Sequence, residues 1–90
     1  MNEKTPEELL EFPCEFPIKV MGRQSEEFES VVLGIFEKHL DDMDQASVSS
    51  KPSGSGNFIS LTVVFEANSK EHLDNIYREL TDHELVLFCL

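Results

Sequence analysis

Hydrophobic and polar residues alternate along two stretches of this 90-residue chain, residues 15–22 and residues 58–67. Strict alternation places successive side chains on opposite faces, so both stretches are predicted to be strands with one buried face. Pro17 has no backbone N–H to give to a ladder and should therefore lie near the start of its strand. The apolar face of the two strands consists of Phe16, Ile18, Val20, Ile59, Leu61, Val63 and Phe65.

Two other stretches repeat their apolar residues at helical spacing. Ser25 can cap the first helix, and Asn68 or Ser69 can cap the second, which should cover residues 70–82. Gly34 lies inside the first helix at a cost of about 1 kcal/mol relative to alanine. We expect it to allow close approach to the sheet. The apolar stripes consist of Phe28, Val31, Val32, Ile35, Phe36 and then His39 or Leu40 in the first helix, and of Leu73, Ile76, Tyr77 and Leu80 in the second.

Three weaker elements complete the pattern. Residues 44–51 are small and polar, as an edge strand can be, and residues 84–90 form a strand that is apolar on both sides. Near the start, Thr5 and Glu8 form a capping box for a short helix over residues 5–12. The alternative for this segment is a frayed tail.

The element order predicts the fold. A short helix followed by β-α-β-β-α-β is an α+β, ferredoxin-like plan, with a four-stranded antiparallel sheet and two helices on one face. The first and third strands should be central and the other two should form the edges. We expect an N-terminal arm at residues 1–14 and a single domain at residues 15–90, because 90 residues allow only one core.

The second face of the sheet should be open and partly apolar. An open apolar patch is typical of a partner or dimer contact. The alternative is that the N-terminal arm folds across it. The residues expected on this face are Lys19, Met21, Ser60, Thr62, Val64 and one side of the last strand, and the face is partly apolar if that side consists of Val86, Phe88 and Leu90.

Charge narrows the function classes. Eighteen acidic residues against seven Lys and Arg give a net charge of −11, which repels phosphate backbones and anionic lipid. We therefore expect no nucleic-acid partner and no membrane partner. The acidic start of the chain lacks the pattern of a signal peptide, and no apolar run approaches the roughly 20 residues of a membrane span. A cytoplasmic protein is the expectation.

The cysteines and histidines indicate neither a metal site nor a cofactor. Cys14, Cys89 and the three histidines are scattered, without the spacing of zinc ligands. If the last strand runs beside the first, the two cysteines should come near each other, although a disulfide is not expected in a reducing compartment. No nucleophile has a general base at a readable spacing, so we expect no catalytic residues.

The stretch KPSGSGN, residues 51–57, has the composition of a phosphate-binding loop. However, its Lys precedes the glycines and a strand follows them, whereas a phosphate loop leads into a helix. A hairpin tip is the favoured interpretation, and a shallow anion-binding nest is the alternative. In either case Lys51, Ser53 and Asn57 are candidate exposed contacts.

The segments FPCEFPIKVMG and KPSGSGN, followed by a closing apolar strand, resemble the YbeD-like family of small bacterial proteins. The matching pieces span nearly the whole chain, and the departure is Gly54-Ser55, where the family more often has Ser-Lys. The resemblance implies a ferredoxin-like fold close to the ACT regulatory domain, a regulatory role by analogy of fold, and a link to lipoate metabolism by gene neighbourhood. It implies no established activity.

Two ligand sites known in this fold would fall between the first strand and the first helix. An acylphosphatase-like site is disfavoured, because Phe28 is followed by Glu29 rather than by the catalytic Arg. An ACT-like ligand turn would need a glycine at the start of the helix, which Gly22-Arg23-Gln24-Ser25 lacks. We therefore predict a non-catalytic protein-interaction or regulatory module that binds another protein, with a homodimer left open. The alternative is an ACT-like sensor of a small ligand. The candidate contacts are Lys19, Lys51, Ser53, Asn57, Val64 and Phe88.

Overall fold

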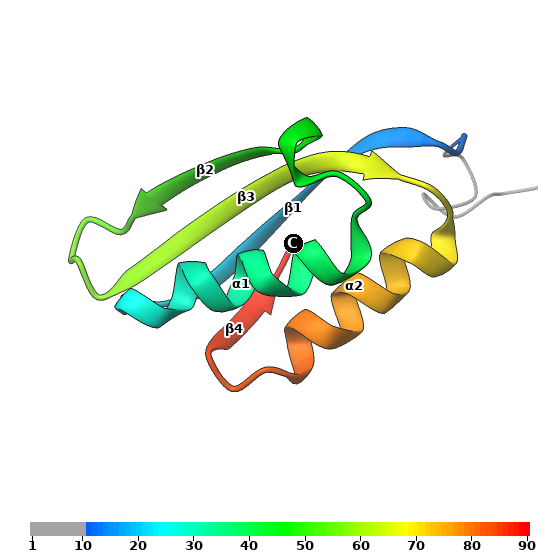
Figure 1. Cartoon of the computed structure of the whole chain (residues 1–90). Helices are drawn as coiled ribbons and strands as arrows, with labels where there is room; N and C mark the ends of the chain where they lie inside the picture. The colour runs from blue at the N-terminus through cyan, green and yellow to red at the C-terminus, as the bar shows by residue number, and fades with distance from the viewer. Residues whose placement is uncertain (1–10) are drawn as a thin grey trace, which may run out of the picture.

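The computed structural model describes residues 11–90. The chain folds into a four-stranded antiparallel sheet with both helices on one side of it (Figure 1). This confirms the predicted β-α-β-β-α-β order and the central position of the first and third strands. The elements are β1 (Cys14–Arg23), α1 (Glu26–His39), the 3-10 turn η1 (Met43–Gln45), β2 (Ser47–Pro52), β3 (Phe58–Ala67), α2 (Lys70–Asp82) and β4 (Val86–Cys89), and the strand order is β2-β3-β1-β4.

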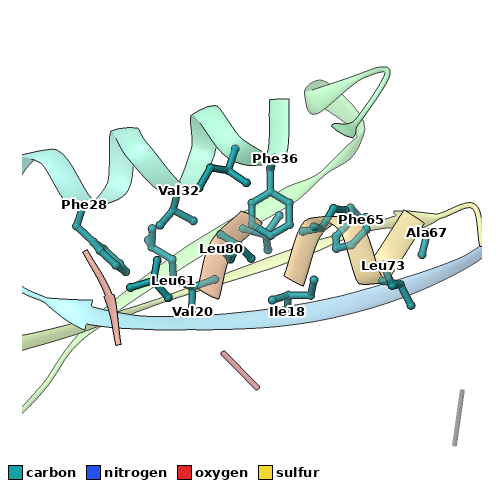
Figure 2. Close-up of a cluster of buried hydrophobic side chains, with 14 residues drawn as sticks. Ile18, Val20, Phe28, Val32, Phe36, Leu61, Phe65, Ala67, Leu73 and Leu80 are labelled. Carbon is teal, nitrogen blue, oxygen red and sulfur yellow. The ribbon is translucent and has the colours of Figure 1, made fainter. Parts of the chain in front are cut away.

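The core lies between the sheet and the helices. In Figure 2, Phe28, Val32 and Phe36 point from α1 toward Val20, Leu61 and Phe65 on the strands. The ring of Phe36 stands edge-on to that of Phe65, with centroids 5.5 Å apart. The alternation of β1 and β3 thus supplies one apolar face, and the helical spacing of α1 and α2 supplies the other. From α2, Leu73, Ile76 and Leu80 complete this core.

Both helices begin at the serine that the sequence predicts. The Ser25 side chain accepts a hydrogen bond from the Phe28 N–H at 3.1 Å, and the Ser69 side chain accepts one from the His72 N–H at 3.0 Å. Each hydroxyl satisfies a backbone donor that has no partner within the helix.

Pro17 is tolerated in the central strand β1 because of where β4 pairs. The N–H and C=O of Lys19 both bond to Leu90, at 3.1 and 2.8 Å, so the backbone of Lys19 faces the β4 side. Pro17 lies two residues earlier, so its backbone also faces the β4 side. The pairing with β4 ends at Lys19, however, and does not reach Pro17. Its missing N–H therefore removes no ladder bond.

The last strand, β4, is shorter than the predicted residues 84–90, and one of its side chains lies on the opposite face from the one expected. Met21 pairs with Phe88 and Gly22 pairs with Val86, so Leu87 is an unpaired extra residue. This bulge turns Val86 into the core, where it is 8% exposed, rather than onto the open face. The expectation that Val86, Phe88 and Leu90 share one face was therefore wrong for Val86, because a bulge breaks the two-residue alternation.

The cysteines do not meet. Cys89 pairs with Val20, whereas Cys14 pairs with Ala67 at the other end of β1, and six residues of extended strand span about 20 Å. Both cysteines are free. The expectation of proximity was wrong because β4 pairs only with the second half of β1.

Gly34 does not serve close approach to the sheet, since a Cβ built there meets nothing within 4 Å. The close approach occurs instead at Gly22, where a Cβ would lie 2.1 Å from the Phe28 ring and 2.7 Å from the Leu85 carbonyl oxygen. The edge strand β2 begins at Ser47, three residues later than predicted, because η1 precedes it.

The predicted N-terminal helix lies outside the described residues, apart from Glu11 and Phe12, which are not helical. Whether the N-terminal arm covers the open face also falls outside them. The division into an arm and a domain stays a prediction. Neither helix within residues 11–90 is long and apolar enough to span a bilayer.

Candidate functional site

The open face of the sheet is built from cross-strand rows, which the strand register defines. One row runs Lys51, Ser60, Met21, Phe88 across the four strands, and the next runs Ser49, Thr62, Lys19, Leu90. Arg23 and Phe58 pair beyond the first row. In the opposite direction Val64 pairs with both Pro17 and Ser47, and Glu15 pairs with Glu66 in the last row. Lys19, Val64 and Phe88 therefore share this face, as predicted, and Lys51, which was expected only as an exposed contact at the hairpin, joins them.

The apolar part of this face lies on the β1 and β4 side. Phe88 is 49% exposed and Leu90 is 67% exposed, while Met21 beside them is half-buried. Ser60, in the middle of the face, is only 6% exposed, and its hydroxyl donates to the Lys51 carbonyl oxygen at 3.3 Å.

Three cations lie on this face, namely Lys19, Arg23 and Lys51. Among residues 11–90, ion pairs within 4 Å involve only Lys38, His39 and Lys70 as cations, all of them on the helices. The three cations of the open face therefore have no carboxylate partner within the described part of the chain. We define Lys19, Met21, Arg23, Lys51, Phe88 and Leu90 as the open-face patch.

Charge is divided between the two layers of the molecule. The two helices carry eight acidic residues against three Lys and Arg, whereas the four strands carry three Lys and Arg against two acidic residues. The two strand carboxylates, Glu15 and Glu66, lie at the end of the sheet remote from Arg23 and Lys51. The patch is thus locally positive on a protein whose net charge is −11.

The hairpin tip holds Ser53 and Asn57 beside the Arg23 end of the patch, since the Ser53 N–H bonds to Phe58 O at 2.8 Å and Phe58 pairs with Arg23. Its donors are used internally: the Gly56 N–H bonds to Ser53 O at 3.0 Å, and the Phe58 N–H bonds to the Ser53 hydroxyl at 3.2 Å. Gly56 has a φ of 77°, which favours glycine in a tight turn. Because these donors point inward, the geometry supports the hairpin interpretation over the anion nest.

In the connection between β1 and α1, a backbone donor is already hydrogen-bonded within the protein. The Gln24 N–H donates to Asn57 O at 2.9 Å, so this backbone donor is not available to a ligand. Arg23 ends β1 on the open face rather than in a ligand loop, and Glu29 on α1 is exposed. These contacts do not assemble the anion clamp that acyl phosphate hydrolysis requires.

The described residues contain no evident catalytic centre. Burial raises the pKa of the Cys89 thiol, so the thiol stays protonated near neutral pH and is a weak nucleophile. His72 is engaged structurally, since its Nδ1 accepts from the Asn68 N–H at 3.0 Å and its Nε2 donates to His39 O at 2.7 Å. Within residues 11–90, no three metal-ligating side chains gather at one place.

Two hollows lie in the helix layer. One, of about 150 Å³, is lined by residues that include Asp41, Asp42, Glu66 and His72. The other lies between the helices beside Gly34 and Lys38. Neither includes a residue of the β1–α1 connection, where the fold's small-molecule sites were considered above.

Arg23 is the member of the patch that the sequence indicated only as part of the Gly22-Arg23-Gln24-Ser25 turn between the first strand and the first helix. The signal was present, because the alternation that gives Lys19 and Met21 reaches Arg23 two residues later. Met21 and Leu90 were placed on this face but not proposed as contacts.

Comparison with solved structures defines the class of protein, an α+β domain of the ferredoxin-like and ACT type. The protein HP0495 from H. pylori has a TM-score of 0.75 at 16% identity, and the alignment covers 99% of this chain and 98% of that one. The ACT domain from GTP pyrophosphokinase of Chlorobium tepidum has a TM-score of 0.66 at 11% identity, with 84% of each chain covered. At these identities the likeness shows the fold alone.

The family is shown by sequence. Residues 7–90 match the family model described as "Protein of unknown function (DUF493)", and the chain belongs to this family. A UPF0250 protein of Neisseria gonorrhoeae is 45% identical over 85 residues, which covers 94% of this chain and 93% of the relative. A UPF0250 protein of Janthinobacterium is 40% identical over the full length of both chains. These matches confirm the YbeD-like resemblance, and they indicate no catalytic function.

Proposed function

We propose that this protein is a cytoplasmic, non-catalytic interaction or regulatory module that binds another protein through the open-face patch. The observation that carries the proposal is the exposure of Phe88 and Leu90 beside Lys19, on a sheet face that the described residues leave uncovered. Core packing does not require aromatic and aliphatic side chains at these positions. Burying such side chains against a partner removes apolar surface from water, which favours the complex.

The geometry of the face suits a protein partner better than a small molecule. The patch runs across the sheet from β2 to β4, and none of its residues lines either of the two hollows described above, whereas small ligands occupy concave sites that bury most of their surface. Phe88 on β4, with Met21 and Arg23 on the adjacent strand β1, matches the enrichment of aromatic, methionine and arginine side chains in protein–protein contacts.

A pull-down from the cell extract of the source organism tests the proposal, with the immobilised full-length protein as bait. Phe88→Glu and Val64→Glu should lose the specific partner, because each places a carboxylate on the open face. Val48→Glu is the control: Val48 is also 40% exposed, but it pairs with the core-facing Val63 and so belongs to the other side of β2.

Melting temperatures of the three variants establish that each still folds. If all three variants retain the same partner as the parent, the open face is not the interaction surface and the proposal is wrong. If Val48→Glu also loses the partner, the edge strand β2 is the surface instead.

The fold shared with the ACT domain supports a second candidate, a sensor of a small ligand. A sensor should gain thermal stability with its ligand, because a ligand that binds only the folded state raises the melting temperature. It should also dimerise. Titration of amino acids and lipoyl compounds, followed by thermal melting, distinguishes the two candidates. The lipoyl compounds are included because of the lipoate link that the family resemblance implies. A flat response counts against the sensor.

A further inference from the structure

The three cations of the open-face patch form a triangle around its centre. Lys51 is two strands away from Met21, and Lys19 and Arg23 lie two residues to either side of Met21 on β1. With strands about 4.8 Å apart and about 3.3 Å per residue, each pair of cations is separated by roughly 12 Å between Cα atoms. Phe88 and Leu90 lie along the β4 side of this triangle.

We propose that the partner contributes a segment in which Asp or Glu side chains flank one or more apolar side chains. This inference rests on the proposed function and specifies the chemistry of the partner. The carboxylates would pair with Lys19, Arg23 and Lys51, which lack ion-pair partners among residues 11–90. The apolar side chains would cover Phe88 and Leu90.

The charge of the rest of the molecule directs an acidic segment to the patch and away from the other surfaces. An acidic segment is repelled by the helix layer, which carries eight carboxylates against three Lys and Arg. It is also repelled by Glu15 and Glu66 at the far end of the sheet. Like charges brought together at an interface cost several kcal/mol, so the acidic surroundings suppress wrong modes of binding while the patch selects the correct one.

Other occupants fit the patch less well. A free anion would meet the cations but would leave Phe88 and Leu90 in water. A second copy docked face to face would bring three more cations toward the first three, since the same patch lies on both surfaces of a two-fold contact. An acidic and apolar segment satisfies both the charges and the exposed apolar area.

The test is selection of peptides from a random 12-residue phage library on the immobilised full-length protein. The selected peptides are then synthesised and titrated by fluorescence anisotropy. Lys19→Glu/Lys51→Glu reverses two cations of the patch. The matched control, Lys70→Glu/Arg78→Glu, makes the same change in net charge on α2.

The selected peptides should be enriched in Asp and Glu next to apolar residues. Their affinity should fall at least tenfold in the open-face double variant and change less than twofold in the α2 variant. Millimolar phosphate should compete only weakly. Peptides without acidic enrichment, equal losses in both variants, or no selected peptides would each overturn the inference.

Full competition by phosphate would identify an anion site instead and would also overturn the inference. Self-association of the parent that disappears in the open-face variant would identify a second copy as the occupant, with the same consequence. The inference can fail while the proposed function stands. If the partner is lost with Phe88→Glu but retained by Lys19→Glu/Lys51→Glu, the open face still binds a protein, and only the acidic chemistry of the partner is overturned.

Discussion

The two faces of the same sheet are built by the same strands and have opposite characters. On the helix side, Ile18, Val20, Leu61 and Val63 are fully buried. On the open side, one residue further along each strand, the side chains are a mixture of cations, hydroxyls and half-exposed apolar groups. The first face has the composition of a core, which needs apolar side chains of complementary volume. Packing within the domain does not explain the composition of the second.

The difference also appears in how charges are used. On the helices, the Glu79 carboxylate contacts both the Lys38 ammonium at 2.6 Å and the His39 ring at 2.9 Å. On the open face, the cations have no such partner among the described residues. Stability should therefore depend strongly on the helix-side face, while binding should depend on the open face.

Truncating a phenylalanine on each face tests this comparison most strongly. Phe36→Ala should lower the free energy of unfolding by about 3–5 kcal/mol, because Phe36 is fully buried and its removal leaves a cavity against Phe65. Phe88→Ala should cost less than about 1 kcal/mol, since the side chain is half exposed. Urea unfolding of both variants measures the difference. Similar losses in the two variants would mean that the open face is part of the stabilising core.

Gly22 in β1 and Gly34 in α1 provide the next contrast. Gly22→Ala should destabilise by about 1–3 kcal/mol, because its Cβ would overlap the Phe28 ring and crowd the fixed Leu85 carbonyl. Gly34→Ala should stabilise by about 1 kcal/mol, since the new methyl group meets open space in a helix interior. Thermal melting of the two variants should give shifts of opposite sign. Shifts of the same sign would contradict the assigned packing.

The smallest expected effect is that of Glu79, and it depends on pH. Hydrogen bonds from Lys38, and secondly from His39, hold the pKa of the Glu79 carboxyl below its usual value. Because the folded-state pKa is lowered, this stabilisation is fully present above the unfolded pKa of about 4.3 and is lost as pH falls through the lowered folded value.

Glu79→Gln should therefore reduce stability near neutral pH by less than about 1 kcal/mol, since the pair is partly exposed. The difference between parent and variant should shrink as the pH falls below about 4.3 and vanish once the pH is below the lowered folded-state pKa. Chemical unfolding at a series of pH values measures it, with Glu37→Gln on α1 as a control, because Glu37 forms no ion pair with any of residues 11–90. A constant difference at all pH values would rule out ionisation of Glu79 as its cause.

The sequence predicted the helices and the long strands because their patterns are local. Ser25 and Ser69 cap their helices through bonds to residues three positions later, and the alternation of β1 and β3 is set residue by residue. The last strand was predicted less well. Leu87 forms a bulge, and no local signal in an entirely apolar segment marks where alternation stops. The position of Val86 therefore could not be predicted.

The candidate site was predicted in part for the same reason. Lys19, Lys51, Val64 and Phe88 were expected to be contacts, and the open-face positions of Lys19, Val64 and Phe88 follow from alternation. The row that joins Lys51 to Phe88 depends on the register of three strand pairs, and two of them, β1–β3 and β1–β4, join strands that are far apart in the sequence. Ser53 and Asn57 were correctly placed at a hairpin tip, and the tip adjoins the Arg23 end of the patch.

The sequence by itself determined the element order, the fold class, the family and the acidity of the protein, since each depends on residue types and their spacing along the chain. Only the tertiary structure decided which charges lie together. Lys19 and Lys51 are far apart in sequence, yet β3 places both on one face of the sheet beside Phe88. Strand register sets such neighbours, and a shift of one residue would move every side chain of the strand to the other face.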